Sequence, residues 1–344
     1  MNPSVLAHKS IRKLSVILIL LLGILILTAC QAVEGSVLHS EEGGDVPLPA
    51  EAAEQSDPAI RTAELPSPPP ETVSPESSPT AVPGTDEPED ASPADASDAL
   101  DWMKLPVIPA ISEHALEIYA RGIAAGHDPR AFSKVGDCQN VPSMFLSIFD
   151  HPGFYTLGEP YEYLQRTIEW FKGSFSRESQ AVRRGFNAAS VVSPLWADPE
   201  FCEQGETPLQ CEIRLHNPSV AIVSLETWWA GKPENYEKYV RQIIEGLIDQ
   251  DVLPILATKA DNLEGDHSIN QILVRLAMEY DIPLWNFWAA VQPLPNHGLS
   301  EDQFHLTFDV NEFDDPEVMK SAWPWRNLTA LQSLDAVRRA VLQP

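Results

Sequence analysis

Basic residues are scarce in this sequence, and their scarcity excludes one large class of partners. The chain has 23 Lys and Arg residues against 50 Asp and Glu residues, which gives a net charge of −27. Residues 1–30 carry +3, whereas residues 31–100 and residues 101–344 each carry −15. A nucleic-acid-binding surface needs basic groups that displace counterions from phosphates, so we expect no nucleic-acid partner.

Long apolar runs are also missing, with one exception near the N-terminus. Residues 14–26 are apolar but too few for a comfortable membrane span; basic residues precede them and Leu27-Thr28-Ala29-Cys30 follows. This pattern is typical of a bacterial lipoprotein signal peptide over residues 1–30, cleaved just before Cys30. Diacylglycerol on the Cys30 thiol and a further acyl chain would anchor the protein stably. We expect a lipid-anchored chain on the extracytoplasmic side of a bacterial cell membrane; an uncleaved signal anchor would give the same side.

Large hydrophobic residues are nearly absent from residues 31–100, which hold twelve of the 31 prolines and sixteen acids. Such a segment buries too little apolar surface to offset the entropy of the chain, so we expect a disordered linker. Its function as a spacer is favoured over a partner-binding Pro-rich motif. Residues 101–344 remain, enough for one folded domain with a good core.

Cysteine is rare as well, with four residues in 344. If Cys30 is lipidated, three cysteines remain in an oxidising compartment, an odd number. Cys202 and Cys211 lie nine positions apart in a polar segment and are the expected disulfide. A bridge from Cys138 to either of them is the alternative, and it would exclude Cys138 from nucleophilic chemistry.

Apolar residues in the last 244 positions alternate between helical and strand patterns, and no internal repeat is present. The patterns predict helices at residues 111–125, 142–149, 161–171, 233–249, 268–280 and 328–341. They predict strands at residues 130–135, 186–192, 220–225, 252–257 and 283–287. Strands that alternate with helices indicate an α/β fold with a parallel sheet covered on both faces.

Several polar or reactive residues follow directly after predicted strands. Cys138, Gly185, the segment Glu226-Thr227-Trp228-Trp229 and Lys259 all do so. In an open parallel sheet, chemistry gathers at the carboxyl ends of the strands, so these residues are expected to share one edge. A thiol at a strand-to-helix turn can attack a carbonyl while nearby N–H groups hold the oxyanion.

Asp302 and His305 are three residues apart near the end of the domain, in Asp302-Gln303-Phe304-His305-Leu306. This spacing lets the carboxylate orient one ring nitrogen while the other faces a nucleophile. A metal site built from Asp302, His305 and His297 has no recognisable ligand spacing, so we expect neither a metal nor another cofactor.

Taken together, these segments resemble the SGNH/GDSL family of esterases and lipases over about residues 130–310. Gly136-Asp137-Cys138 is similar to the family's first block, Arg184-Gly185-Phe186-Asn187-Ala188 to its second, and Asp302-x-x-His305 to its last. The segments 220–227 and 231–236 are similar to its third block and the helix after it, and residues 282–288 to the stretch before its catalytic loop.

The resemblance implies a flavodoxin-like three-layer α/β/α sandwich and a catalytic set. Cys138 would be the nucleophile, His305 the general base and then acid, and Asp302 the residue that orients His305. The N–H groups of Cys138 and Gly185 would form the oxyanion hole.

Two departures from the family pattern bear on activity. Cys138 stands where the family has serine, and Glu226-Thr227-Trp228-Trp229 stands where it has Gly-x-Asn-Asp. The oxyanion donor from that asparagine is therefore missing. Losing one such donor costs on the order of 3 kcal/mol in other enzymes, roughly a hundredfold to a thousandfold in rate.

Two functions are consistent with this sequence. The first is a tethered hydrolase of acyl esters on a small molecule or a cell-envelope glycan; the second is a catalytically inactive glycan- or protein-binding module. Trp228 and Trp229 beside Glu226 are candidate substrate-binding residues, since adjacent indoles can stack on a sugar ring. A structural role for both indoles, one at the core edge and one over a loop, is the alternative.

Overall fold

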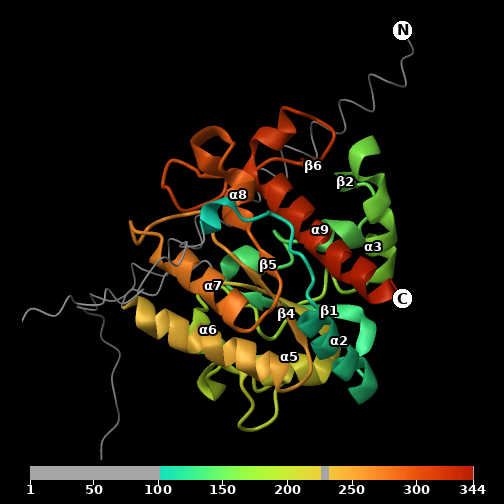
Figure 1. Ribbon diagram of the computed structural model, residues 1–344, viewed down its shortest axis with the longest axis vertical. Coiled ribbons are helices and arrows are strands. Elements are labelled where there is room, and N and C mark those ends of the chain that lie inside the picture. The colour runs from blue at the N-terminus through green and yellow to red at the C-terminus, as the bar shows by residue number, and fades with distance from the viewer. Residues whose placement is uncertain (1–100, 226–231, 344) are drawn as a thin grey trace, which may run out of the picture. The chain divides into compact units, whose positions relative to one another are not determined.

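The computed structural model describes residues 101–225 and 232–343 (Figure 1). The predicted signal peptide, Cys30, the predicted linker and the candidate residues Glu226, Trp228 and Trp229 lie outside the described residues. Within the part of the chain that is described, no helix is both long and apolar enough to cross a membrane.

A parallel sheet of four strands forms the centre of the fold. Its order is β1-β3-β4-β5, and all three strand pairs are parallel. The strands are β1 (Asp128–Gly136), β3 (Pro218–Ser224), β4 (Leu253–Ala257) and β5 (Leu284–Trp285). A single parallel bridge from Gly136 to Val182 continues the sheet beyond β1. The segment around Val182 thus occupies the position of a further strand.

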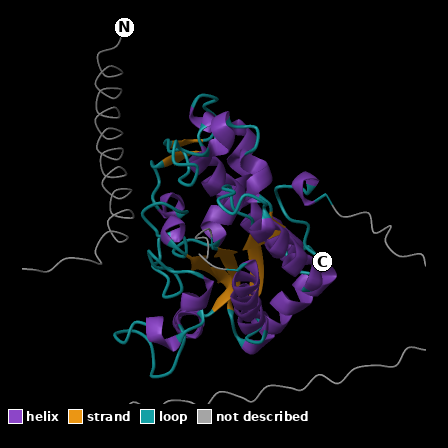
Figure 2. Ribbon diagram, turned by 90° about the vertical axis from the view of Figure 1, so that its left-hand side faces the viewer, coloured by secondary structure: helices purple, strands orange, loops and turns teal. Residues whose placement is uncertain are grey.

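Helices cover the sheet on both faces, as Figures 1 and 2 show. Figure 1 shows three of them grouped on one side of the strands: α5 (Pro208–His216), α6 (Pro233–Ile248) and α7 (Ser268–Glu279). The other side carries α2 (Glu113–Ala125), α3 (Gln165–Trp170) and α9 (Ala322–Leu342). The result is an α/β fold with three layers, as the sequence predicts.

Shorter elements complete the described part of the chain. Two strands, β2 (Tyr155–Thr156) and β6 (Asn311–Glu312), pair in parallel away from the main sheet. The short helices are α4 (Ala188–Val191) and α8 (Phe287–Val291). The 3-10 turns are η1 (Trp102–Lys104), η2 (Cys138–Asn140), η3 (Ser147–Asp150), η4 (Glu159–Leu164), η5 (Pro194–Trp196), η6 (Pro295–Gly298) and η7 (Val318–Lys320).

The central strands are apolar because both of their faces are covered. All seven residues of β3 and all five of β4 are buried, and so are the last six of β1. Side chains of a strand alternate between two faces, so a run without polar alternation requires helices on each side. The position of this sheet fixes the edge at which the candidate site is built.

Most of the predicted elements are confirmed, and two are wrong. Residues 142–149 do not form the predicted helix: Leu146 has φ 66°, and only the turn η3 follows it. Residues 186–192 form the helix α4 instead of the predicted strand, because the Asn187 side chain accepts from the Ser190 N–H and caps a helix. The bridge to β1 comes earlier, at Val182.

Two helices differ from the sequence prediction in extent. The helix α5 begins within the segment taken as a polar loop, because Thr207 and Gln210 form a reciprocal capping box. The helix α9 begins at Ala322 rather than residue 328, since Pro324 lies in its first turn, where a missing N–H has no helical partner to lose.

Cys202 and Cys211 form a disulfide in the structure, with their Cα atoms 5.2 Å apart. Cys211 lies on α5 and Cys202 in the loop before it. The disulfide therefore fastens this loop to α5, in the helical layer that also contains α6 and α7.

We expect the double variant Cys202→Ala/Cys211→Ala to lower the free energy of unfolding of the full chain by roughly 2–3 kcal/mol, because a short closed loop restricts the unfolded chain. Urea denaturation measures the change. Reductant should bring the wild type to the level of the variant and leave the variant unchanged. A wild type insensitive to reductant would contradict the pairing.

Lys134 is a buried cationic residue on β1, with 1% of its surface exposed. Its Nζ donates to the carbonyl oxygen of Phe175 at 2.8 Å, and burial lowers the pKa of its ammonium group to about 7. On the other face of β1, Ser133 donates to the buried carboxylate of Glu212 at 2.6 Å, and burial raises the pKa of Glu212. These polar groups fasten β1 to its neighbours.

We expect the wild type to gain stability from Lys134 as pH rises from about 7 toward the unfolded lysine pKa of about 10.4, since the unfolded chain binds more protons in that window. Lys134→Met should lack this rise. Urea denaturation at several pH values measures both, with Lys172→Met, at an exposed lysine, as the control. Parallel pH profiles for wild type and Lys134→Met would contradict the prediction.

Candidate active site

The exit of β1 presents a thiol at the carboxyl edge of the sheet. Among residues 131–140, Cys138 is the single one that is not buried. It begins the turn η2, and the Oδ1 atom of Asp137 accepts from the Gln139 N–H at 3.0 Å and caps this turn. The chain thus turns sharply at Asp137 and leaves the Cys138 side chain partly exposed.

Gly136 is required by the close approach of η2 to β3. A Cβ atom on Gly136 would lie 2.1 Å from Nδ2 of Asn140 and 2.5 Å from the carbonyl oxygen of Ser224. Nδ2 of Asn140 donates to that same oxygen at 2.7 Å. The glycine before the aspartate therefore allows the turn that carries Cys138 to hydrogen-bond to the neighbouring strand end.

Gly185 lies beside this turn in the order of the sheet. Val182 pairs in parallel with Gly136, so the two segments leave the sheet at the same edge. Cys138 follows two residues after Gly136, and Gly185 follows three residues after Val182. Gly185 is exposed and has φ 82°, a left-handed conformation that favours glycine. This placement is compatible with the predicted oxyanion donors.

Asp302 and His305 form a hydrogen-bonded pair in the structure. Oδ2 of Asp302 lies 2.5 Å from Nδ1 of His305, and Oδ1 of Asp302 accepts from the backbone N–H of His305 at 2.9 Å. The loop is closed by an antiparallel bridge between Leu299 and Leu306 and by a 2.7 Å hydrogen bond from Ser300 N–H to the His305 carbonyl oxygen. The carboxylate therefore fixes both the backbone and the ring of the histidine.

The second ring nitrogen of His305 makes no hydrogen bond to the protein. Nε2 is buried and has no hydrogen-bond partner among the described residues. Partial burial raises the pKa of the Asp302 carboxyl, but hydrogen bonds from the His305 ring and from two backbone N–H groups outweigh it and hold that pKa below its usual range. The pair is thus ionised at the carboxylate in neutral solution.

The start of α9 contacts both the turn at Cys138 and the loop at His305. Backbone N–H of Ala322 donates to Oγ1 of Thr307 at 2.9 Å, two residues after His305. One turn further along α9, Nη2 of Arg326 donates to Oγ of Ser224 at 2.9 Å and to Oδ1 of Asn140 at 3.4 Å. Both loops consequently belong to the same end of the domain.

Side chains that could ligate a metal ion form one cluster elsewhere among the described residues. Cys202, Glu206 and Cys211 bring their ligand atoms within 4.8 Å of one another. The two sulfur atoms are bonded to each other, and Glu206 is paired with Arg214. His297, considered above beside Asp302 and His305, places Nδ1 3.1 Å from the carbonyl oxygen of Gln292.

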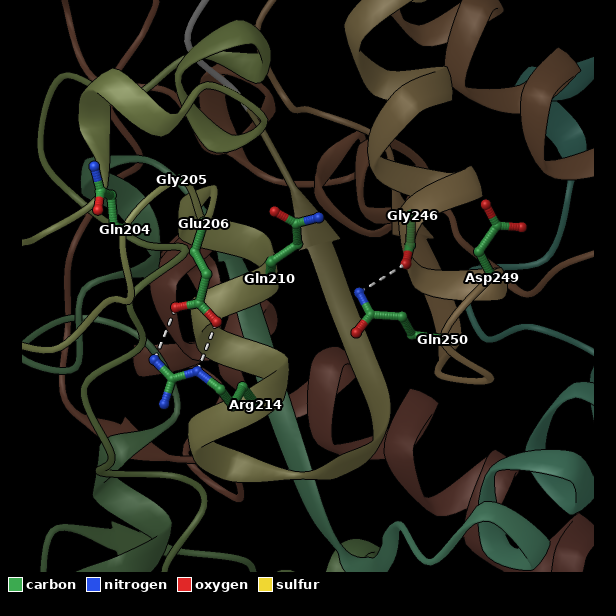
Figure 3. Close-up of a pocket in the computed structure, with 8 residues that line it drawn as sticks. All are labelled: Gln204, Gly205, Glu206, Gln210, Arg214, Gly246, Asp249 and Gln250. Carbon is green, nitrogen blue, oxygen red and sulfur yellow. Dashed lines mark hydrogen bonds and ion pairs between the residues drawn. The ribbon is translucent and has the colours of Figure 1, made fainter.

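A hollow of about 690 Å³ lies between α5 and the end of α6 (Figure 3). Figure 3 shows Arg214 bonded through two nitrogen atoms to Glu206, at 2.6 and 2.8 Å. None of the predicted site residues lines this hollow, and its one cation is already paired.

A second cavity, of about 380 Å³, lies against the loop that carries Asp302 and His305. Gln303 of that loop and Trp288 at the start of α8 line it. Neither residue is among those that the sequence predicts to bind a ligand. Trp288 follows the predicted strand 283–287, a position that could have drawn attention to it.

Comparisons with known proteins identify similar folds. No protein-family model matches the chain, and no curated protein matches it. A GDSL-like lipase from Bacteroides thetaiotaomicron is similar, with 12% identity, TM-score 0.34, and coverage of 67% of this chain and 98% of that one. AlinE4, an SGNH-hydrolase family esterase, is similar with 18% identity, TM-score 0.31, and coverage of 63% and 98%. At such low identities and TM-scores, the chemistry of this chain has to be inferred from its own residues.

We expect the carboxyl carbon of Asp302, followed by ¹³C NMR, to titrate below the ordinary aspartate pKa of about 3.9. His305→Ala removes the ring hydrogen bond and should raise the Asp302 pKa. His114→Ala, at an exposed histidine three residues before Glu117 on α2, is the matched control and should leave it unchanged. An Asp302 titration insensitive to His305→Ala would contradict the pairing in solution.

Proposed function

We propose that this chain is a hydrolase of acyl esters in which Cys138 is the nucleophile. The observation that carries the proposal is the Asp302–His305 pair, held at 2.5 Å with Nε2 of the ring left without a partner among the described residues. The partly exposed Cys138 at the exit of β1 supplies the candidate nucleophile at the same end of the domain. A nucleophile and a general base are the minimum that acyl transfer requires.

The reaction divides into two steps. The Cys138 sulfur attacks the ester carbonyl carbon while Nε2 of His305 takes the thiol proton, and the proton then passes to the departing alkoxide to give the alcohol. A thioester on Cys138 remains. Water, deprotonated by the same nitrogen, attacks the thioester; the carboxylic acid leaves and the thiol is restored. Asp302 keeps the ring oriented and stabilises its positive charge in both steps.

Stabilisation of the oxyanion distinguishes this site from that of the family it resembles. The N–H groups of Cys138 and Gly185 are the proposed donors, and the asparagine of the family's third block has no counterpart in Glu226-Thr227-Trp228-Trp229. The proposal therefore entails a slow enzyme, since one missing donor costs about a hundredfold to a thousandfold in rate.

The setting of the reaction follows from the N-terminal sequence. A lipid on Cys30 and the linker over residues 31–100 would hold the domain at a bacterial membrane, on its extracytoplasmic side. Esters within reach of such a tether include acyl groups on cell-envelope glycans. We therefore propose an acylated glycan as the substrate.

Hydrolysis of p-nitrophenyl acetate by the purified full chain tests the catalytic assignment. Cys138→Ala should abolish activity above background, and His305→Ala should lower it at least a hundredfold, the loss expected when a general base is removed. His114→Ala is the matched control and should retain full activity. Alkylation of the non-reduced protein followed by mass mapping should label Cys138 while Cys202 and Cys211 stay protected.

Two results would refute the catalytic assignment. One is equal activity in wild type, Cys138→Ala and His305→Ala; the other is no activity in wild type or Cys138→Ser on either p-nitrophenyl acetate or an acetylated glycan. The second result, together with glycan binding that survives His305→Ala and is lost in Trp228→Ala, would instead support the binding-module alternative.

A further inference from the structure

The cavity of about 380 Å³ shares a wall with the candidate catalytic loop. Leu299 and Gln303, which line it, belong to the closed loop that contains Asp302 and His305. Its volume lies within the roughly 300–1,000 Å³ typical of small-molecule sites. A ligand in this cavity would therefore lie next to the groups that we assign to catalysis.

The lining of the cavity contains no Asp, Glu, Lys or Arg. This is notable in a domain with so many acids. The polar groups are amides and imidazoles, and they come from three different segments: Asn262, His267, Gln292, His297 and Gln303. The remaining lining residues are apolar, and the largest of them is Trp288. A ligand matched to this surface is uncharged and offers both hydroxyl groups and an apolar face.

Each amide side chain in the cavity uses one of its two polar atoms in a hydrogen bond to the protein and leaves the other without a described partner. Oδ1 of Asn262 accepts from His267 N–H at 2.8 Å, while Nε2 of Gln292 donates to the Trp288 carbonyl oxygen at 3.1 Å and Nε2 of Gln303 to that of Ser300 at 3.3 Å. In the described chain, Nδ2 of Asn262 and both glutamine Oε1 atoms have no partner. One hydrogen-bond donor and two acceptors therefore remain for a ligand. The hydrogen bond at the other atom of each amide fixes the direction in which they point.

One of the two imidazoles, that of His267, has a ring nitrogen without a hydrogen bond to any described residue. Nδ1 of His267 is buried and has no hydrogen-bond partner among the residues described. The His267 ring packs edge-on against Trp102 and Trp288, with centroids 5.7 Å apart in each case. The aromatic contacts therefore hold the His267 ring in place at the wall of the cavity.

Buried ion pairs hold one segment that lines the cavity. Ala260 and Asn262 lie beside Lys259, which is 1% exposed and whose Nζ bonds to Asp261 at 2.5 Å and Glu264 at 2.7 Å. The side chain of Lys259, predicted at the edge of the sheet, is thus engaged in these ion pairs. A segment that is already held in place lowers the entropic cost of binding.

We propose that this cavity binds a neutral sugar ring, the alcohol part of the ester that Cys138 attacks. Sugar hydroxyl groups donate and accept hydrogen bonds at once, which suits amides and imidazoles, and the C–H face of a pyranose packs on an indole. The cavity disfavours carboxylated and phosphorylated ligands, because no Lys or Arg lines it. The role of the cavity in catalysis depends on the proposed hydrolase function, but its binding of sugar does not.

The test compares a sugar ester with esters that lack a sugar, using the full chain in detergent. The substrates are 6-O-acetylglucose, p-nitrophenyl acetate and p-nitrophenyl octanoate; saturation-transfer NMR with methyl β-D-glucopyranoside measures binding without catalysis. The variant is Asn262→Ala/Gln292→Ala, at two lining residues outside the loop that holds Asp302 and His305. The matched control is Gln250→Ala, because Nε2 of Gln250 also donates to the carbonyl oxygen four residues earlier but faces the other hollow.

The double variant should raise KM for 6-O-acetylglucose about tenfold, from the loss of two neutral hydrogen bonds, and should weaken the saturation of the glucoside. Its kcat/KM for p-nitrophenyl acetate should match that of wild type, and Gln250→Ala should change neither value. If no ester is cleaved, saturation that is present in wild type and lost in the double variant supports the sugar site while the hydrolase function fails.

Three results would overturn the sugar site. The first is absence of glucoside saturation in a wild type that hydrolyses p-nitrophenyl acetate, which leaves the hydrolase function standing. The second is a change on the octanoate ester instead of the sugar ester, which would make the cavity an acyl pocket. The third is an equal effect of the double variant and Gln250→Ala.

Discussion

A buried guanidinium joins the parts of the molecule on which the candidate site depends. Arg326 on α9 is 0% exposed, and its Nη2 atom reaches Asn140 beyond β1 and Ser224 at the end of β3. Four aromatic rings surround its carbon atom Cζ at 4.7–5.7 Å: Phe145, Trp285, Phe287 and Trp323. Because a charge is buried only where hydrogen bonds and ring faces replace water, its position fixes the helix, the two strand ends and the rings together.

Arg326 therefore contributes both to the geometry of the candidate site and to the stability of the fold. The turn that presents Cys138 is held from three directions: by Gly136 in the strand, by Ser224 in the neighbouring strand and by Arg326 on the helix. These contacts hold the turn in one position, which the proposed role of Cys138 requires.

The sequence predicts the parts of this molecule that depend on local pattern. The strands β3 and β4 and the helices α6 and α7 are long and strongly patterned, and Asp302 and His305 are close in the chain. The short elements were missed, because a single capping side chain decides between strand and helix at Asn187, and the left-handed Leu146 interrupts the helix predicted over residues 142–149. The cavity at Trp288 was beyond prediction, since its walls come from segments separated by some forty residues that only the tertiary fold brings together.

The charge of the domain and the chemistry of the cavity lead to the same class of ligand. Residues 101–344 carry a net charge of −15, so an anionic polymer would be repelled from the domain as a whole before it reached the site. At physiological ionic strength the repulsion is screened beyond about 8 Å, so the groups that line the cavity decide the rest. Those groups include no Asp, Glu, Lys or Arg, and hydroxyl groups can make the hydrogen bonds that the amides leave unmade. The net charge of the domain does not repel an uncharged glycan, and the cavity can hydrogen-bond to its hydroxyl groups. A negatively charged glycan is repelled and finds no Lys or Arg in the cavity.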